Sequence, residues 1–101
     1  MTRYILQDKT PTAELNLELW AKWYETGDRR VALTRIGNYR VSTVFLALDH
    51  SFGETLPQLF ETMIFKGEDY LELWAERCST WDEAEKMHER GCEYVQKNLT
   101  L

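Results

Sequence analysis

The sequence has no long apolar run, few glycines and prolines, and only two cysteines. The missing run excludes a membrane-spanning helix, which needs roughly 20 apolar residues. The first residues, MTRYILQDKTP, also lack the apolar core of roughly 7 to 15 residues that marks a secretory signal. Five glycines and two prolines in 101 residues argue against a disordered chain. We therefore expect a soluble cytoplasmic protein in which Cys78 and Cys92 stay reduced.

Positive charge is also scarce, since 17 acidic and 12 basic side chains give a net charge of -5. An acidic chain does not favour contact with phosphate backbones, so nucleic acid is not an expected partner. The sequence contains no phosphate-binding loop, dinucleotide-binding glycine motif, nucleophile elbow, HExxH zinc motif or EF-hand loop. We therefore expect no cofactor, and no membrane as a partner.

What the chain does have is apolar volume. Its apolar fraction is 44%, its aromatic fraction is 13%, and it has four tryptophans. A length of 101 residues is close to the commonest domain size, and such a chain buries enough surface to fold without metal or disulfide. We predict one α+β domain over residues 1–101.

Hydrophobic periodicity predicts two helices separated by a block of strands. Residues 3–7 resemble a short first strand. Residues 13–26 predict a helix capped by Thr12, because they place apolar side chains at helical spacing in a stripe that we expect to pack in the core: Leu15, Leu19, Trp20, Trp23 and Tyr24. The last helix begins after Thr80, because Thr80-x-x-Glu83 is a complete capping box.

Between the helices the pattern is that of strands. Residues 30–36 and 39–48 flank a Gly-Asn dipeptide, which predicts a hairpin whose glycine takes a positive φ. Residues 58–65 form the next strand, and residues 70–78 alternate as an edge strand does, although their composition also suits a helix. The predicted order is β-α-β-β-β-β-α, a two-layer sandwich with a mostly antiparallel sheet of four to five strands and two helices on one face. The other face is open to water or to a partner.

Asp49 and His50 follow the predicted central strand, where a loop can present functional groups. A carboxylate beside an imidazole offers an acid–base pair if the side chains converge, and Glu61 could join from the next strand. Adjacent side chains on an extended chain point in opposite directions, so the alternative is a turn whose polar groups satisfy the backbone. Phe52 and Glu54 of the same loop are candidate binding residues.

The histidines and cysteines suggest a second hypothesis, a zinc site. His88 and Cys92 have i, i+4 spacing on the last helix, and His50 with Cys78 would complete a tetrahedral set. The alternative is that the cysteines are small buried hydrophobes, since no CxxC or HxxxH pair is present. Cys78 is also a candidate nucleophile, because it lies just before a helix N-terminus.

An interaction surface is the third hypothesis. A basic cluster on and around the predicted hairpin could bind an anion or an acidic surface, or could be solvated. Its members are Arg29, Arg30, Arg35 and Arg40. Trp74 lies in the aromatic edge strand 70–78, and an exposed edge can pair with its own copy in a homodimer. We therefore expect a protein partner or self-association, with catalysis by the Asp49 and His50 loop as the alternative.

Three segments carry a resemblance: VSTVFLALDHSF at 41–52, PQLFETMIF at 57–65 and STWDEA at 79–84. In these segments the chain resembles a set of uncharacterised small proteins from phages, prophages and their bacterial hosts. The likeness spans about residues 28–91. It implies a setting and no activity, namely a phage-type accessory protein in the cytoplasm of the host cell.

Overall fold

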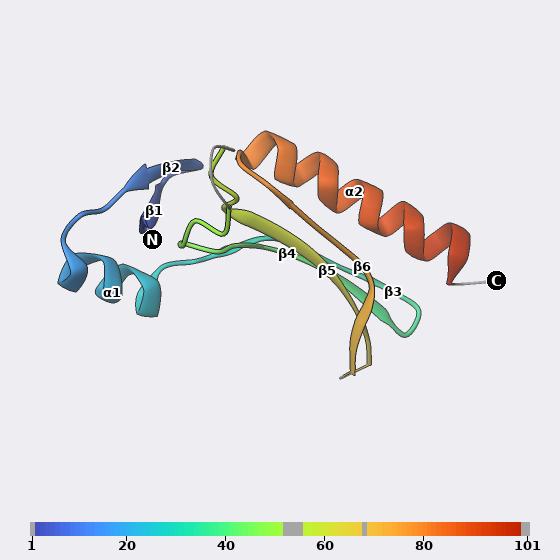
Figure 1. Ribbon diagram of the computed structural model, residues 1–101. Helices are drawn as coiled ribbons and strands as arrows, with labels where there is room; N and C mark the ends of the chain where they lie inside the picture. The colour runs from blue at the N-terminus through green and yellow to red at the C-terminus, as the bar shows by residue number, and fades with distance from the viewer. Residues whose placement is uncertain (1, 52–55, 68, 100–101) are drawn as a thin grey trace.

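Six strands and two helices form along the part of the chain that the computed structural model describes, residues 2–51, 56–67 and 69–99. They are β1 (Tyr4–Gln7), β2 (Thr10–Ala13), α1 (Leu17–Thr26), β3 (Arg30–Ile36), β4 (Tyr39–Phe45), β5 (Phe60–Lys66), β6 (Asp69–Cys78) and α2 (Trp81–Asn98). Figure 1 shows α2 lying across one face of the larger sheet, whereas β1, β2 and α1 lie beyond one end of it. Neither of these helices is long and apolar enough to cross a membrane.

The larger sheet is an antiparallel meander in the order β3-β4-β5-β6. Gly37 has a φ of 59° in the turn where Ile36 pairs with Tyr39, which confirms the predicted hairpin. Within the described residues β6 pairs with β5 alone and forms an edge of the sheet, as predicted for residues 70–78. The α+β class and the order of elements are confirmed.

The N-terminal part departs from the prediction in its details. Residues 10–13 form β2, which pairs with β1 in a separate two-stranded sheet. Thr12 is therefore not the cap of α1. The cap is Asn16, whose side-chain oxygen accepts a hydrogen bond from the Leu19 N–H at 3.1 Å, so the helix begins at Leu17. α1 packs against β1 on the side of the molecule away from α2, so only α2 covers the sheet face that we expected both helices to share (Figure 1).

The hydrophobic core lies between α2 and the sheet. Six inward-pointing residues of the central strands are fully buried: Val41, Thr43 and Phe45 of β4 and Phe60, Thr62 and Ile64 of β5. From α2, Met87 packs with the cluster around Phe45 and Phe60, and Val95 packs with Val41 and Ile64. Gly91 lets the helix approach the sheet closely, since a Cβ there would lie 3.0 Å from a methyl group of Val41.

The N-terminus of α2 has the predicted capping box. Thr80 Oγ1 accepts a hydrogen bond from the Glu83 N–H at 3.2 Å, and the Glu83 carboxylate accepts one from the Thr80 N–H at 3.1 Å. Two backbone donors that the helix itself cannot satisfy are thereby paired.

Replacing Thr80 with alanine is expected to lower the free energy of unfolding by about 1 kcal/mol, because the Glu83 N–H loses its acceptor. Urea denaturation followed by circular dichroism measures this change. The variant Thr80→Ser keeps the hydroxyl and serves as the matched control. An alanine variant as stable as the serine variant would contradict the assigned role of the cap.

Candidate functional site

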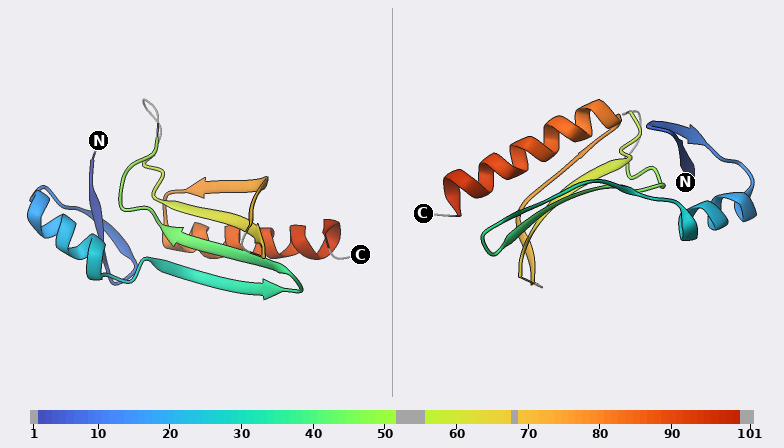
Figure 2. Two further views of the ribbon diagram at one scale, coloured as in Figure 1. Left: turned by 90° about the horizontal axis from the view of Figure 1, so that it is seen from below. Right: turned by 180° about the vertical axis from the view of Figure 1, so that it is seen from behind.

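The sheet face opposite α2 has no helix or strand of residues 2–51, 56–67 or 69–99 packed on it (Figure 2). The left view of Figure 2 looks at this face, with α2 behind the strands. Side chains alternate along a strand, so the residues between the buried positions point to this side. We call this surface the open face. It consists of Leu33, Arg35, Arg40, Ser42, Val44, Glu61, Met63, Phe65, Ala75 and Arg77.

The middle of the open face is mainly apolar. Leu33, Ser42, Met63 and Ala75 are successive cross-strand partners on β3, β4, β5 and β6, so their side chains form one row. A surface hollow beside β6 is lined in part by Met63 and Ala75. Contiguous apolar side chains on a small domain mark a surface for a macromolecular contact.

Charged groups lie at both ends of the open face. Near the turn between β3 and β4, Arg35 pairs directly with Arg40, whose guanidinium carbon lies 5.2 Å from the centroid of the Phe65 ring. At the other end Arg77 Nε donates to Glu61 Oε2 at 2.8 Å. Neither Arg35 nor Arg40 has an acidic partner within the described part of the chain. These two unpaired arginines give the turn end of the open face positive charge in a chain of net charge -5, and like charges directly opposite each other repel.

The Asp49 and His50 loop has the geometry of a turn. Asp49 Oδ1 accepts hydrogen bonds from the N–H groups of Ser51 at 2.8 Å and Gln58 at 3.1 Å. These bonds, that of Ser51 above all, lower the pKa of the Asp49 carboxyl. The His50 N–H donates to the Gln58 carbonyl, while Glu61 is held by Arg77 on the open face. The contacts of the described residues therefore do not join these three side chains into an acid–base set.

Phe52 and Glu54, the predicted binding residues of that loop, lie outside the described residues.

The predicted zinc ligands do not come together. Among the residues that the structure describes, no group of three or more His, Cys, Asp or Glu side chains could hold a metal ion. Cys78 and Cys92 are free thiols. Burial, reinforced by the nearby Glu83, raises the pKa of Cys78 to about 11. A nucleophile or zinc ligand needs the opposite shift, so neither role suits Cys78 here.

His88 is instead part of a buried hydrogen-bonded chain. Its ring nitrogens lie 2.8 Å from Thr34 Oγ1 and 2.7 Å from Thr43 Oγ1, and Thr43 bonds to Thr62 on the next strand. Burial lowers the pKa of His88, which favours the neutral ring. These hydrogen bonds connect α2 to β3, β4 and β5. The sequence places His88 on the apolar face of its helix, but only the strand register shows which threonines meet it.

The predicted basic cluster is divided in two. Arg29 lies over the Tyr24 ring, with its guanidinium carbon 4.0 Å from the centroid, and lines a hollow with Arg30 and Val44 at the start of β3. Arg35 and Arg40 lie at the opposite end of that strand, at the turn.

Trp74, predicted as a contact residue of the exposed surface, lies on the covered face. A Cβ at Gly91 of α2 would be 3.2 Å from the Trp74 ring, which also packs beside Tyr94. Ala75 pairs with Met63 on the open face, so the preceding side chain must point to the other side. The edge strand was predicted correctly, but its register was needed to orient the tryptophan.

α1 is attached to the body of the molecule through its two tryptophans. Trp20 Nε1 donates to the carbonyls of Tyr4 at 3.1 Å and Ala47 at 3.2 Å. Trp23 packs edge-on against Phe45, with their centroids 5.6 Å apart. The predicted role of these tryptophans in the core is confirmed, although no residue of α1 is itself fully buried.

The segment before and at the start of α1 exposes three leucines. Leu15 is 91% exposed, Leu17 55% and Leu19 56%, although we expected Leu15 and Leu19 to belong to the packed stripe of the helix. Glu14 and Glu18 alternate with them. We call residues 14–19 the acidic leucine knob. Hydrophobic periodicity detects such leucines but cannot tell a packed side chain from an exposed one.

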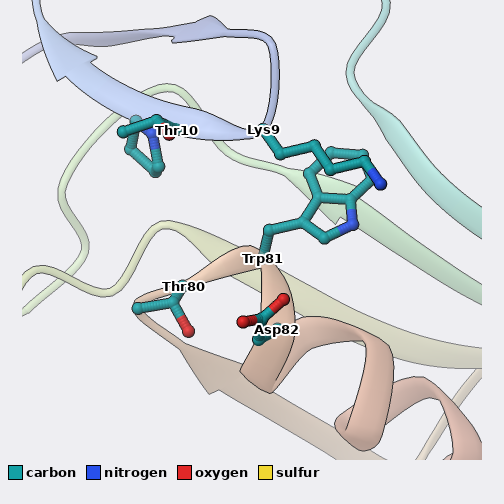
Figure 3. A pocket seen from close by; sticks show the side chains of 6 residues that line it. Lys9, Thr10, Thr80, Trp81 and Asp82 are labelled. Carbon is teal, nitrogen blue, oxygen red and sulfur yellow. The ribbon is translucent and has the colours of Figure 1, made fainter.

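A further hollow of about 290 Å³ lies between the β1–β2 turn and the start of α2 (Figure 3). Lys9 lies over the Trp81 ring, with Nζ 5.5 Å from the centroid. Trp81 Nε1 is buried without a hydrogen-bond partner among the described residues. The helix N-terminus and Lys9 would favour an anion, but Asp82 and Glu83 already occupy the first turn of α2 and oppose one. The chemistry of this hollow therefore selects no ligand class.

Comparisons of the chain with protein-family models, curated proteins and solved structures find no match.

Proposed function

We propose that this chain is a phage-type accessory protein of the host cytoplasm that acts, without catalysis, by binding protein through its open face. The observation that carries the proposal is the mainly apolar centre of that face, where Leu33, Met63 and Ala75 share one cross-strand row with Ser42 and no described element covers them. When one face of an antiparallel sheet packs on the core and the other meets only water, the residues on the water side are normally polar. Folding of the single chain does not account for this apolar row.

The form and charge of the surface favour protein over other ligands. Small-molecule sites enclose most of their ligand, whereas the open face is a sheet surface as wide as its four strands. Nucleic acid would require an excess of positive charge, but the chain has a net charge of -5. The segments that resemble phage and prophage proteins include most of β4 and β5, the two central strands of this surface.

A photo-crosslinking amino acid placed at Met63 tests the proposal. We expect irradiation of the full chain, expressed in bacterial cells, to give a product of higher mass on denaturing gels. The same group placed at Lys86, on the exposed side of α2, is the matched control and should give little product. The absence of any product at Met63, or equal products at both positions, would contradict an interaction surface on the open face.

A further inference from the structure

Among the described residues, the open face and a second apolar surface are left without a cover by the fold of the chain. The second surface is the acidic leucine knob, whose three leucines are each more than half exposed. Trp20 and Trp23 anchor α1 at the end of the core, so the knob does not cover the open face of its own chain. A β-sheet face is commonly covered by a helix, and an amphipathic helix commonly packs on a sheet.

The two surfaces have opposite charge. The acidic leucine knob carries Glu14 and Glu18 and no basic residue. The turn end of the open face carries Arg35 and Arg40, which have no acidic partner among the described residues. Apposing these surfaces would pair acids with arginines and relieve the repulsion between the two guanidinium groups. The complementary partner for each surface is therefore present in the chain itself.

The arrangement of α1 allows a reciprocal contact. α1 lies beyond one end of the sheet, on the side away from α2 (Figure 1). Residues 27–30, which follow α1, line a hollow together with Val44 of the open face. The arginine pair lies at the opposite end of the sheet. Consider two copies whose open faces point toward each other and that are related by a two-fold axis perpendicular to the strands. The α1 end of each sheet then lies beside the arginine end of the other, so the knob of each copy reaches the arginines of its partner.

Resting on the proposed function of the open face, we infer that two copies of this chain associate about a two-fold axis, with the acidic leucine knob of each copy docked on the open face of the other. Each copy contributes both surfaces, so the contact closes and leaves no unpaired surface for further growth.

The available area suits a weak but specific dimer. The open face is four strands wide at about 4.8 Å per strand, and β3, β4 and β5 have 7 residues each at about 3.3 Å per residue, so the face covers about 440 Å². Two such faces, each covered by a knob and the adjoining part of α1, bury at most about 1,800 Å² in total when both sides of each contact are counted, within the range of specific interfaces. An interface of this size is compatible with a dissociation constant in the micromolar range.

Charge reversal provides the test. We expect wild-type chain to form dimers in sedimentation velocity runs at high micromolar concentration. Glu18→Arg in the knob and Arg35→Glu on the open face should each weaken self-association by at least about tenfold, because each sets like charges against each other in both halves of the dimer. An equimolar mixture of the two variants should form a heterodimer, because both contacts then pair opposite charges.

The controls are Glu85→Arg and Lys86→Glu, which make the same charge changes on the exposed side of α2. Both should associate as the wild type does. Glu18 and Arg35 are themselves exposed, and Arg35→Glu places an acid opposite Arg40, so circular dichroism should show folded variants. A wild type that stays monomeric, variants that associate normally, or a mixture that fails to recover association would each overturn the inference.

Peptide mapping of the product crosslinked at Met63 separates this inference from the proposed function. A product with twice the chain mass, joined to residues 14–19, supports both. A product with a different protein leaves the proposed function intact and overturns the self-docking of the knob. If Met63 gives no product at all, both proposals fail.

Discussion

Replacing Phe60 with alanine is expected to lower the free energy of unfolding by about 3–5 kcal/mol. Phe60 is fully buried at the start of β5, and its ring packs against Phe45 at 5.3 Å and Trp81 at 6.2 Å between centroids. It therefore joins β4, β5 and the start of α2, and its removal leaves a cavity that three elements line. Urea denaturation measures the loss as a lower midpoint with an unchanged slope.

Phe65→Ala is the matched control for this prediction. Phe65 lies five residues further along the same strand, on the open face, where it is partly exposed beside Arg40. The same truncation there removes less buried surface and leaves no enclosed cavity, so we expect a cost below about 1.5 kcal/mol. Equal losses in the two variants would contradict the assignment of one sheet face as covered and the other as open.

Replacing His88 with alanine is expected to lower the free energy of unfolding by about 2–4 kcal/mol at pH 7. His88 is only 7% exposed, and its ring bonds to Thr34 and Thr43. The variant loses the packing of the ring and leaves the two hydroxyl groups without this partner. Thr34→Val, which removes one bond at the edge of the sheet, should cost less. An alanine variant of wild-type stability would show that the hydrogen bonds of His88 do not stabilise the packing of α2 on the sheet.

The burial of His88 also predicts that the free energy of unfolding depends on pH. Burial lowers the pKa of His88 from its usual value of 6.5, so the unfolded chain takes up a proton before the folded one does. The stability that neutral His88 provides is complete above pH 6.5 and decreases as the pH falls below it, by at most about 1.4 kcal/mol per pH unit. Asp49, whose pKa is lowered from 3.8, acts in a separate window at more acidic pH.

Urea denaturation at several pH values between 7 and 5 measures this dependence. In the His88→Ala variant the loss of stability over that interval should be smaller than in wild type. If the two proteins lost the same stability between pH 7 and 5, another group would be responsible for it.

These stability experiments and the binding experiments address opposite sides of the same sheet. The face under α2 carries Phe45, Phe60 and the threonines that bond to His88. Its residues determine whether the domain folds. The open face contributes less to that core, so its arginines can be exchanged for acids while the fold persists. This separation makes charge reversal at Arg35 a test of association and not of folding.

The sequence by itself determined the elements whose signals are local. The capping box Thr80-x-x-Glu83, the Gly-Asn turn and the alternation in residues 70–78 each depend on a few neighbouring residues, and each was confirmed. The α+β class follows from the order of these elements.

Only the tertiary structure decided which side chains meet. Strand register placed Trp74 under α2 and brought Thr34 and Thr43 to His88, while Asp49 was drawn into hydrogen bonds with the backbone of its own loop. Packing left Leu15, Leu17 and Leu19 exposed, although periodicity alone placed two of them in a packed stripe. Local patterns fix backbone conformation within a few residues, whereas the environment of a side chain depends on residues far along the chain. For this protein, local patterns predicted the elements, whereas only packing defined the open face and the acidic leucine knob.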